Sequence, residues 1–247
     1  MKLFRSTVLM LAILGVAACS SSSETTTTSS TSALSAPSVT EAEPTSTVAA
    51  SAQASTFTAE VWADNWFSLY VNGQLVGEDS VPITTERSFN AETITFTATY
   101  PLTIAMITKD YKETDSGLEY IGEPNQQMGD GGFVAQFTDT ATGEIIATTN
   151  GNWRGFVIQT APLNSECEKS ADPNTECQFE ILEEPSGWTS PSFDDATWPT
   201  ATVYTADEVG VKDGYDTITW DGNAKLIWGS NLNTNNTILW RIHVPQL

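Results

Sequence analysis

The stretch that decides the fold is residues 67–73, FSLYVNG, in which apolar and polar side chains alternate up to an Asn-Gly pair. A period of two is typical of a half-buried strand, because successive side chains of a strand point to opposite faces. Asn-Gly is a strong hairpin signal, since a type I′ turn needs positive φ at both central residues. We therefore predict a strand that ends at Val71, a turn at Asn72-Gly73, and a return strand that begins with Leu75 and Val76.

The same period recurs on both sides of this hairpin, in short segments that are rich in β-branched and aromatic residues. Turn residues such as Pro101 and Gly143 separate them, and no long amphipathic helix pattern appears. The segments are residues 57–62, 94–98, 102–108, 133–137, 144–148, 225–228 and 238–244. Many short strands with such turns predict an all-β fold, an antiparallel β-sandwich or a barrel.

Size and charge narrow the classes of protein further. Residues 1–56 lack the apolar content to join a core, so about 190 of the 247 residues are left to fold, enough for one domain. Ten Lys and Arg stand against 31 Asp and Glu, which gives a formal net charge of −21. Because affinity for phosphate is carried by clustered cations, we expect no nucleic acid partner.

Residues 1–18 have the pattern of a bacterial signal peptide, with Lys2 and Arg5 before an apolar run at residues 8–16 that is too short to span a bilayer. Residues 16–19, VAAC, resemble the lipobox of bacterial lipoproteins. That resemblance implies that Cys19 is lipidated and becomes the first residue of the mature chain. The alternative is an ordinary small-residue cleavage site with Cys19 incidental. Ser20 in place of Asp favours the outer membrane over the inner membrane in the lipoprotein pattern.

Residues 19–56 are predicted to be a disordered tether behind the lipidated cysteine. More than half of residues 20–56 are Ser or Thr, and none is aromatic. Such a segment cannot bury enough apolar surface to offset the entropy of ordering. We expect the domain at residues 57–247 to be displayed on the bacterial cell envelope, and to contact the membrane through its anchor only.

Several phrases resemble, in the same order, those of galactose-binding-domain-like jelly rolls. One of them also resembles the F-D-D-S-x-W phrase of sugar-binding domains attached to glycosidases. The phrases are ADNWFSLYVNG at residues 63–73, GGFVAQ at 131–136, GEIIATT at 143–149, NWR at 152–154, FDDATW at 193–198, AKLIW at 224–228 and LWR at 239–241. A weaker similarity points to a Trp-rich module that precedes phosphatidylethanolamine-binding-protein-like domains. The resemblance implies a jelly-roll sandwich with ligands, where bound, in loops at one end, although many such domains only brace a neighbour.

Cys167 and Cys177 lie in a polar stretch of an exported chain, which predicts a disulfide. Two cysteines without a nearby histidine make a poor zinc site. A nucleophilic cysteine would need a base, and the only histidine is His243. Strand alternation places His243 toward solvent, and no G-x-S-x-G motif is present, so a Ser-His-Asp hydrolase is not expected.

Acidic residues leave two further interpretations open. A glycosidase needs only two carboxylates about 5 to 10 Å apart, and pairs such as Asp194 and Asp195 are plentiful. The related sandwiches often hold a structural calcium ion, but no loop matches the EF-hand pattern, so the metal ligands stay unassigned. We expect no other cofactor.

Eight tryptophans are many for one domain, and indoles stack on the apolar face of sugar rings. Those in strand-like phrases are expected in the core: Trp62, Trp153, Trp198, Trp228 and Trp240. Those beside turn residues are candidates for a sugar platform: Trp66, Trp188 and Trp220, with Tyr215 a lesser candidate. The alternative is that they close the ends of the sandwich.

The sequence therefore predicts a lipid-anchored, non-catalytic binding module, with carbohydrate as its ligand class. The alternative is a structural or protein-interaction domain of an envelope complex, which would bind through an edge strand or an apolar patch. A glycosidase is the third interpretation.

Overall fold

The structure is a computed structural model that describes residues 53–85, 90–110 and 112–246. All of these residues belong to one compact unit. The predicted signal peptide, Cys19 and almost all of the predicted tether lie outside the described residues. Among the residues described, no helix is long and apolar enough to cross a bilayer.

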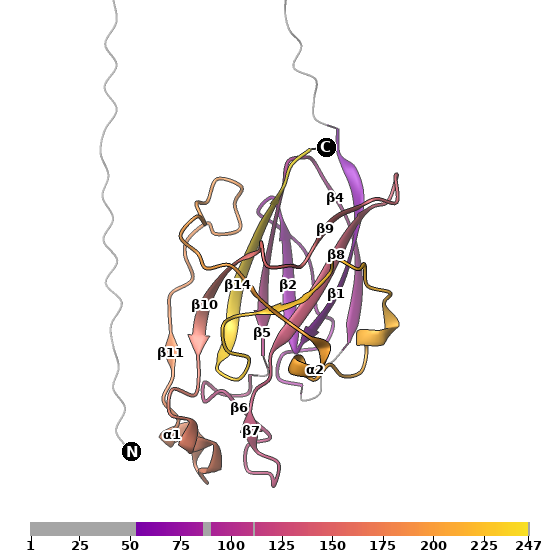
Figure 1. The fold of residues 1–247 in the computed structure, drawn as a ribbon. Coiled ribbons are helices and arrows are strands. Elements are labelled where there is room, and N and C mark those ends of the chain that lie inside the picture. Colours follow the sequence, from indigo (N-terminus) through magenta and orange to yellow (C-terminus); the bar gives the residue numbers. More distant parts are fainter. Residues whose placement is uncertain (1–52, 86–89, 111, 247) are drawn as a thin grey trace, which may run out of the picture. The chain divides into compact units, whose positions relative to one another are not determined.

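Two antiparallel sheets face each other, which confirms the predicted all-β sandwich (Figure 1). The β8 sheet has the order β12 (Thr202–Tyr204), β13 (Leu226–Trp228), β8 (Gly132–Asp139), β1 (Ser55–Asp64) and β4 (Ala91–Ala98), and β9 (Ile145–Thr148) also pairs with β8. The β14 sheet has the order β11 (Glu180–Ile181), β10 (Arg154–Thr160), β14 (Asn235–Val244), β5 (Leu102–Lys109), β2 (Trp66–Val71) and β3 (Gln74–Glu78). A small hairpin joins β6 (Leu118–Glu119) to β7 (Gln127–Met128).

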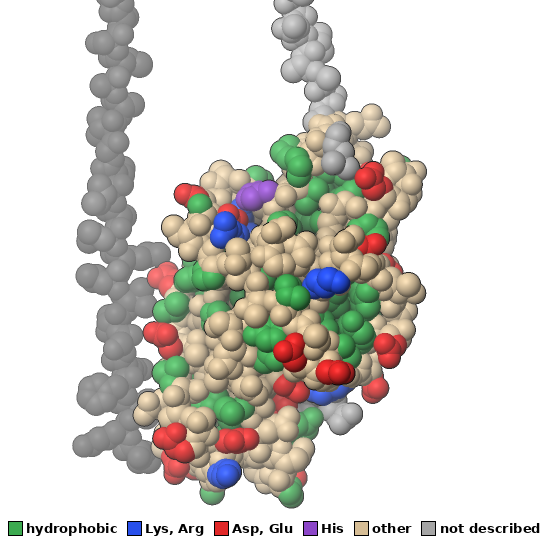
Figure 2. All heavy atoms as spheres, viewed as in Figure 1, with side chains coloured by type: hydrophobic (Ala, Val, Ile, Leu, Met, Phe, Trp, Pro, Cys, Tyr) green, Lys and Arg blue, Asp and Glu red, His purple; other side chains and the backbone are tan. Residues whose placement is uncertain are grey.

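The helical segments are short. They are α1 (Pro173–Glu176), α2 (Ala206–Val209) and single 3₁₀ turns at Ser165–Lys169 and Tyr215–Thr217. The start of β1 lies near the end of β14. Gln53 and Ser55 line one surface hollow together with Gln246, which follows β14. Figure 1 places β6 and β7 at the opposite end of the sandwich. On the face shown in Figure 2 basic side chains are few and scattered among more numerous acidic ones.

The hairpin at residues 67–73 forms as predicted. Strand β2 ends at Val71, and Asn72 and Gly73 have φ values of 51° and 83°. The Asn72 side chain also donates to the Thr99 carbonyl at 2.9 Å and accepts from the Thr103 amide at 2.8 Å. Asn72 therefore joins this turn to the β4–β5 connection, beyond supplying the turn conformation.

Alternation along the central strands builds the core between the sheets. In β1 the fully buried Phe57, Ala59 and Val61 point toward the β14 sheet, where β2 contributes Phe67 and Leu69. β1 begins at Ser55, two residues before the predicted domain boundary, because Ser55 and Thr56 also pair with β4. The alternation with a period of two in the sequence thus arises because every second side chain of these strands is buried in one core between the sheets.

The outer face of the β14 sheet is covered by the loop at residues 184–199. Arg241 of β14 is fully buried beneath this loop, and its Nε donates to Asp195 Oδ2 at 2.7 Å. The guanidinium also donates to the carbonyls of Trp188 and Phe193. Trp188 and Trp198 pack with Ala105 and Leu239 in the same cluster. One buried cation therefore binds three positions of the loop, and apolar packing adds to its attachment.

The predicted disulfide between Cys167 and Cys177 is confirmed, with a Cα–Cα distance of 5.3 Å. Both cysteines are buried and pack against Leu118 of β6. The bridge joins the 3₁₀ turn at Ser165–Lys169 to the end of α1, and both segments pack against the small β6–β7 hairpin at this point.

We predict that Asp195→Asn lowers the free energy of unfolding by about 3 kcal/mol, because it leaves the buried guanidinium of Arg241 without its counter-charge. Urea unfolding followed by tryptophan fluorescence measures the loss. The control is Asp194→Asn, since Asp194 is exposed and its bond to the Ala196 amide survives the change. Equal stability of the two variants would contradict the role given to Arg241.

Candidate functional site

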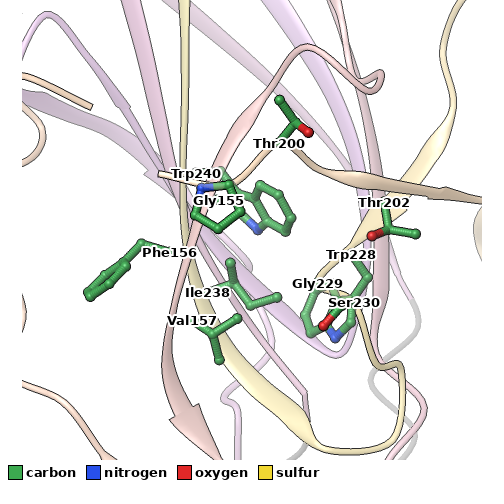
Figure 3. A pocket seen from close by; sticks show the side chains of 11 residues that line it. Gly155, Phe156, Val157, Thr200, Thr202, Trp228, Gly229, Ser230, Ile238 and Trp240 are labelled. Carbon is green, nitrogen blue, oxygen red and sulfur yellow. The ribbon is translucent and has the colours of Figure 1, made fainter. Parts of the chain in front are cut away.

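An apolar cavity of about 300 Å³ lies between the sheets, where β12 and β13 approach β10 and β14. Figure 3 shows the indoles of Trp228 and Trp240 beside Val157 and Ile238, while Phe156 points away. Three hydroxyl groups complete the lining, those of Thr200, Thr202 and Ser230. Thr200 and Ser230 are exposed, so the polar groups lie toward the solvent side of an apolar hollow.

The two indoles are held firmly by their neighbours. Trp240 Nε1 donates to Thr108 Oγ1 at 2.9 Å, and Trp228 Nε1 donates to the Asn235 carbonyl at 2.7 Å. A Cβ at Gly155 would overlap the Trp240 ring, so only glycine admits this packing at that position of β10. Because both N–H groups are already bonded inside the protein, the indoles offer only carbon to the cavity.

The opposite wall is the segment from Pro199 to Thr202, and main-chain bonds fix it. The Gly155 amide donates to the Pro199 carbonyl at 2.8 Å, and the Ala201 amide donates to the Trp153 carbonyl at 2.8 Å. Thr202 then pairs with Trp228 where β12 begins. The cavity is therefore preformed, and a ligand would not have to order its walls.

The lining of this cavity is electrically neutral. None of the eleven residues that line it carries an ionisable side chain or a thiol. It can bury an apolar ring face and exchange hydrogen bonds with hydroxyls, but its own side chains supply no acid, base or metal ligand.

The predicted sugar platform is divided between two faces of the molecule. Trp66 is half-buried with Lys109 Nζ 4.9 Å from its ring centroid, and Trp188 is only 2% exposed and donates to Glu184. Both lie on the β14 sheet side. Trp220 and Tyr215 are half-buried partners, with ring centroids 5.9 Å apart, on the side of the β8 sheet.

The structure thus brings Trp220 and Tyr215 together, but not with Trp66 or Trp188. The predicted core assignment of Trp62, Trp153, Trp198, Trp228 and Trp240 is confirmed, since all five are buried. Two of those core residues, Trp228 and Trp240, also line the cavity. No local pattern indicated this, because the cavity arises only where β13 meets β14.

A cluster of carboxylates lies at the end of the sandwich that carries β6 and β7. Oxygens of Asp110, Glu119 and Asp130 lie within 4.8 Å of one another. Lys212 Nζ lies 3.0 Å from Asp130 Oδ2 and 3.3 Å from Asp64 Oδ2. Burial, reinforced by the charge of Asp130, raises the pKa of Asp64 to about 8. Asp64, Asp110 and Glu119 are buried, so this cluster is too enclosed to admit a sugar ring.

His243 is the second grouping with catalytic residue types. Its side chain is 52% exposed, in line with the predicted outward direction, and its Nε2 lies 3.5 Å from Asp195 Oδ2. Its Nδ1 lies 3.0 Å from Thr103 Oγ1, but Thr103 is buried. A substrate therefore cannot reach the hydroxyl in this arrangement.

No protein-family model matches the chain, and no curated protein or solved structure is significantly similar to it. The resemblance to galactose-binding-domain-like jelly rolls stays a prediction, as does the weaker similarity to the module that precedes phosphatidylethanolamine-binding-protein-like domains.

We predict that iodide quenches mainly the fluorescence of Trp66 and Trp220, because the other six indoles are buried. The double change Trp66→Phe and Trp220→Phe should remove most of the quenchable emission. Trp188→Phe serves as the matched control and should leave it unchanged. A large loss of quenching in the Trp188 variant would show that the loop at residues 184–199 does not cover that ring in solution.

Proposed function

We propose that residues 57–247 form a non-catalytic binding module of the bacterial cell envelope, anchored by a lipid on Cys19 in the outer membrane. The ligand is a carbohydrate, and one of its rings enters the cavity between the sheets. The observation that carries this proposal is the composition of that cavity. Aromatic and aliphatic carbon forms most of its lining, and the other lining groups include three hydroxyls. The cavity lining contributes no charge.

A neutral sugar matches this composition. A pyranose ring has one apolar face and a border of hydroxyls, and pockets for small ligands begin near 300 Å³. Thr200, Thr202 and Ser230 can exchange hydrogen bonds with such hydroxyls, while Trp228, Val157 and Ile238 contact carbon. Because the indoles are buried and present little open face, we expect weak binding, with a Kd of about 1 mM.

A second candidate function is supported by a different surface. Strand β11 is an edge of the β14 sheet, and the segment around it exposes Phe179, Ile181 and Leu182 at 45%, 49% and 41%. An exposed apolar edge can accept a strand from another protein. This surface favours the interpretation of a structural or protein-interaction accessory domain, and it does not depend on the cavity.

The test is a titration of residues 49–247, the compact unit, with neutral mono- and oligosaccharides followed by calorimetry or NMR. We predict that Ser230→Phe abolishes binding, because the new ring fills the exposed mouth of the cavity. Thr202→Val should weaken binding by about 2- to 10-fold through the loss of one hydroxyl. Ser186→Phe places the same ring on an exposed site away from the cavity and should bind normally.

Binding that survives Ser230→Phe would contradict the cavity as the site. No binding of any sugar at about 10 mM, well above the expected Kd, would contradict the carbohydrate proposal. In that case, capture of an envelope protein that is lost on Ile181→Lys would favour the accessory-domain alternative.

A further inference from the structure

The second site of interest is built by four separate segments at one end of the sandwich. Asp64 ends β1, Asp110 follows β5, Glu119 lies in β6, and Asp130 lies between β7 and β8. Figure 1 shows β6 and β7 at the end opposite the C-terminal end of β14. This acidic end shares no residue with the sugar cavity.

Negative charge is in excess there. Two of the four carboxylates, those of Asp64 and Asp130, pair with the ammonium of Lys212. Asp64, Asp110 and Glu119 are buried, so water cannot screen them as it screens the acids elsewhere on the surface. Buried carboxylates are normally paired with cations or coordinate a metal.

Two buried oxygen atoms on consecutive residues have no hydrogen-bond partner in the part of the chain that the structure describes. They are Asp64 Oδ1 and Asn65 Oδ1, on side chains that are 0% and 1% exposed. Asp64 Oδ2 lies 3.3 Å from Lys212 Nζ, which in turn lies 3.0 Å from Asp130. The Asp64 carboxylate therefore faces the same space as the other carboxylates. A buried acceptor without a donor requires an explanation, and a bound cation provides one.

The backbone around Asp130 is shaped to approach these carboxylates. At Gly129 any Cβ would collide with the Asp110 carboxylate, so the close approach depends on glycine. At Gly131 a Cβ would collide with the Trp228 ring. The Gly129 carbonyl also accepts from Asn233 Nδ2 at 3.2 Å. Asp130 is thus held between two positions that tolerate no side chain.

We propose that Asp110, Glu119 and Asp130, together with the unpartnered oxygen of Asp64, bind a calcium ion. All of these donors are hard oxygens, and neither imidazole nor thiolate is among them, which argues against zinc. Calcium takes six to eight oxygens at 2.3–2.6 Å, so ligands on opposite sides of the ion lie about 4.8 Å apart. One oxygen from each of the three carboxylates lies no farther than that from the others. Water completes the coordination shell.

The experiment uses the purified chain treated with EDTA and then titrated with CaCl₂. We expect the melting temperature to rise saturably, by about 5 °C or more at a hundredfold excess over Kd, and MgCl₂ to have less effect. Terbium should bind in the same place and luminesce on tryptophan excitation, since Trp228 lies against Gly131, and calcium should displace it. This outcome is independent of sugar binding.

Variants separate an ion site from a purely structural ion pair. Asp130→Asn, at a partly exposed carboxylate, should weaken calcium binding at least 10-fold, and Lys212→Gln should strengthen it because a competing positive charge is removed. The control is Asp213→Asn, at an exposed acid beside Lys212. The proposal would be overturned if neither the melting temperature nor the terbium signal changes on addition of calcium up to about 10 mM. Weaker calcium binding in Lys212→Gln, or equal affinities in Asp130→Asn and Asp213→Asn, would also overturn it.

Discussion

The buried guanidinium of Arg241 is the interaction on which the rest of the β14 sheet depends. A cation without water is tolerated only where its donors are all bonded, and here Asp195, Trp188 and Phe193 supply the acceptors. The loop that carries those acceptors is thereby pressed onto the sheet. The loop ends at Pro199, and Pro199 and Thr200 belong to one wall of the cavity. The position of this cavity wall therefore depends on an ion pair on the outer face of the β14 sheet.

Glycines set the second constraint. Gly155 leaves room for the Trp240 ring and Gly131 leaves room for the Trp228 ring, so both indoles approach the backbone closely. Walls that are already ordered need little conformational entropy to receive a ligand. The same contact links the two sites, because Gly131 follows Asp130 of the acidic end. An ion bound at Asp130 would steady the backbone on which Trp228 rests.

Local patterns in the sequence were sufficient to predict the strands and turns. They were insufficient to predict which residues meet at the cavity and at the acidic end. The strand and turn at residues 67–73 could be predicted because alternation and Asn-Gly act over a few residues. Trp188 stood beside Gly187 and was predicted as an exposed candidate, but it is buried because Arg241 binds its carbonyl from 53 residues away. The carboxylates of Asp64, Asp110, Glu119 and Asp130 share no motif. Only the topology, which brings the ends of β1 and β5 beside the β6–β7 hairpin, places them together.

Whether a sugar ring enters the cavity between the sheets is measured most directly by a two-dimensional ¹H–¹⁵N NMR titration of the labelled domain with an oligosaccharide that binds it. We predict shifts in the indole N–H signals of Trp228 and Trp240 and in the Gly155 amide signal, with the signals of Trp66 and Trp220 unmoved. Shifts confined to Trp66, or to Trp220 with Tyr215, would contradict it and place the ligand on an outer face of the sandwich.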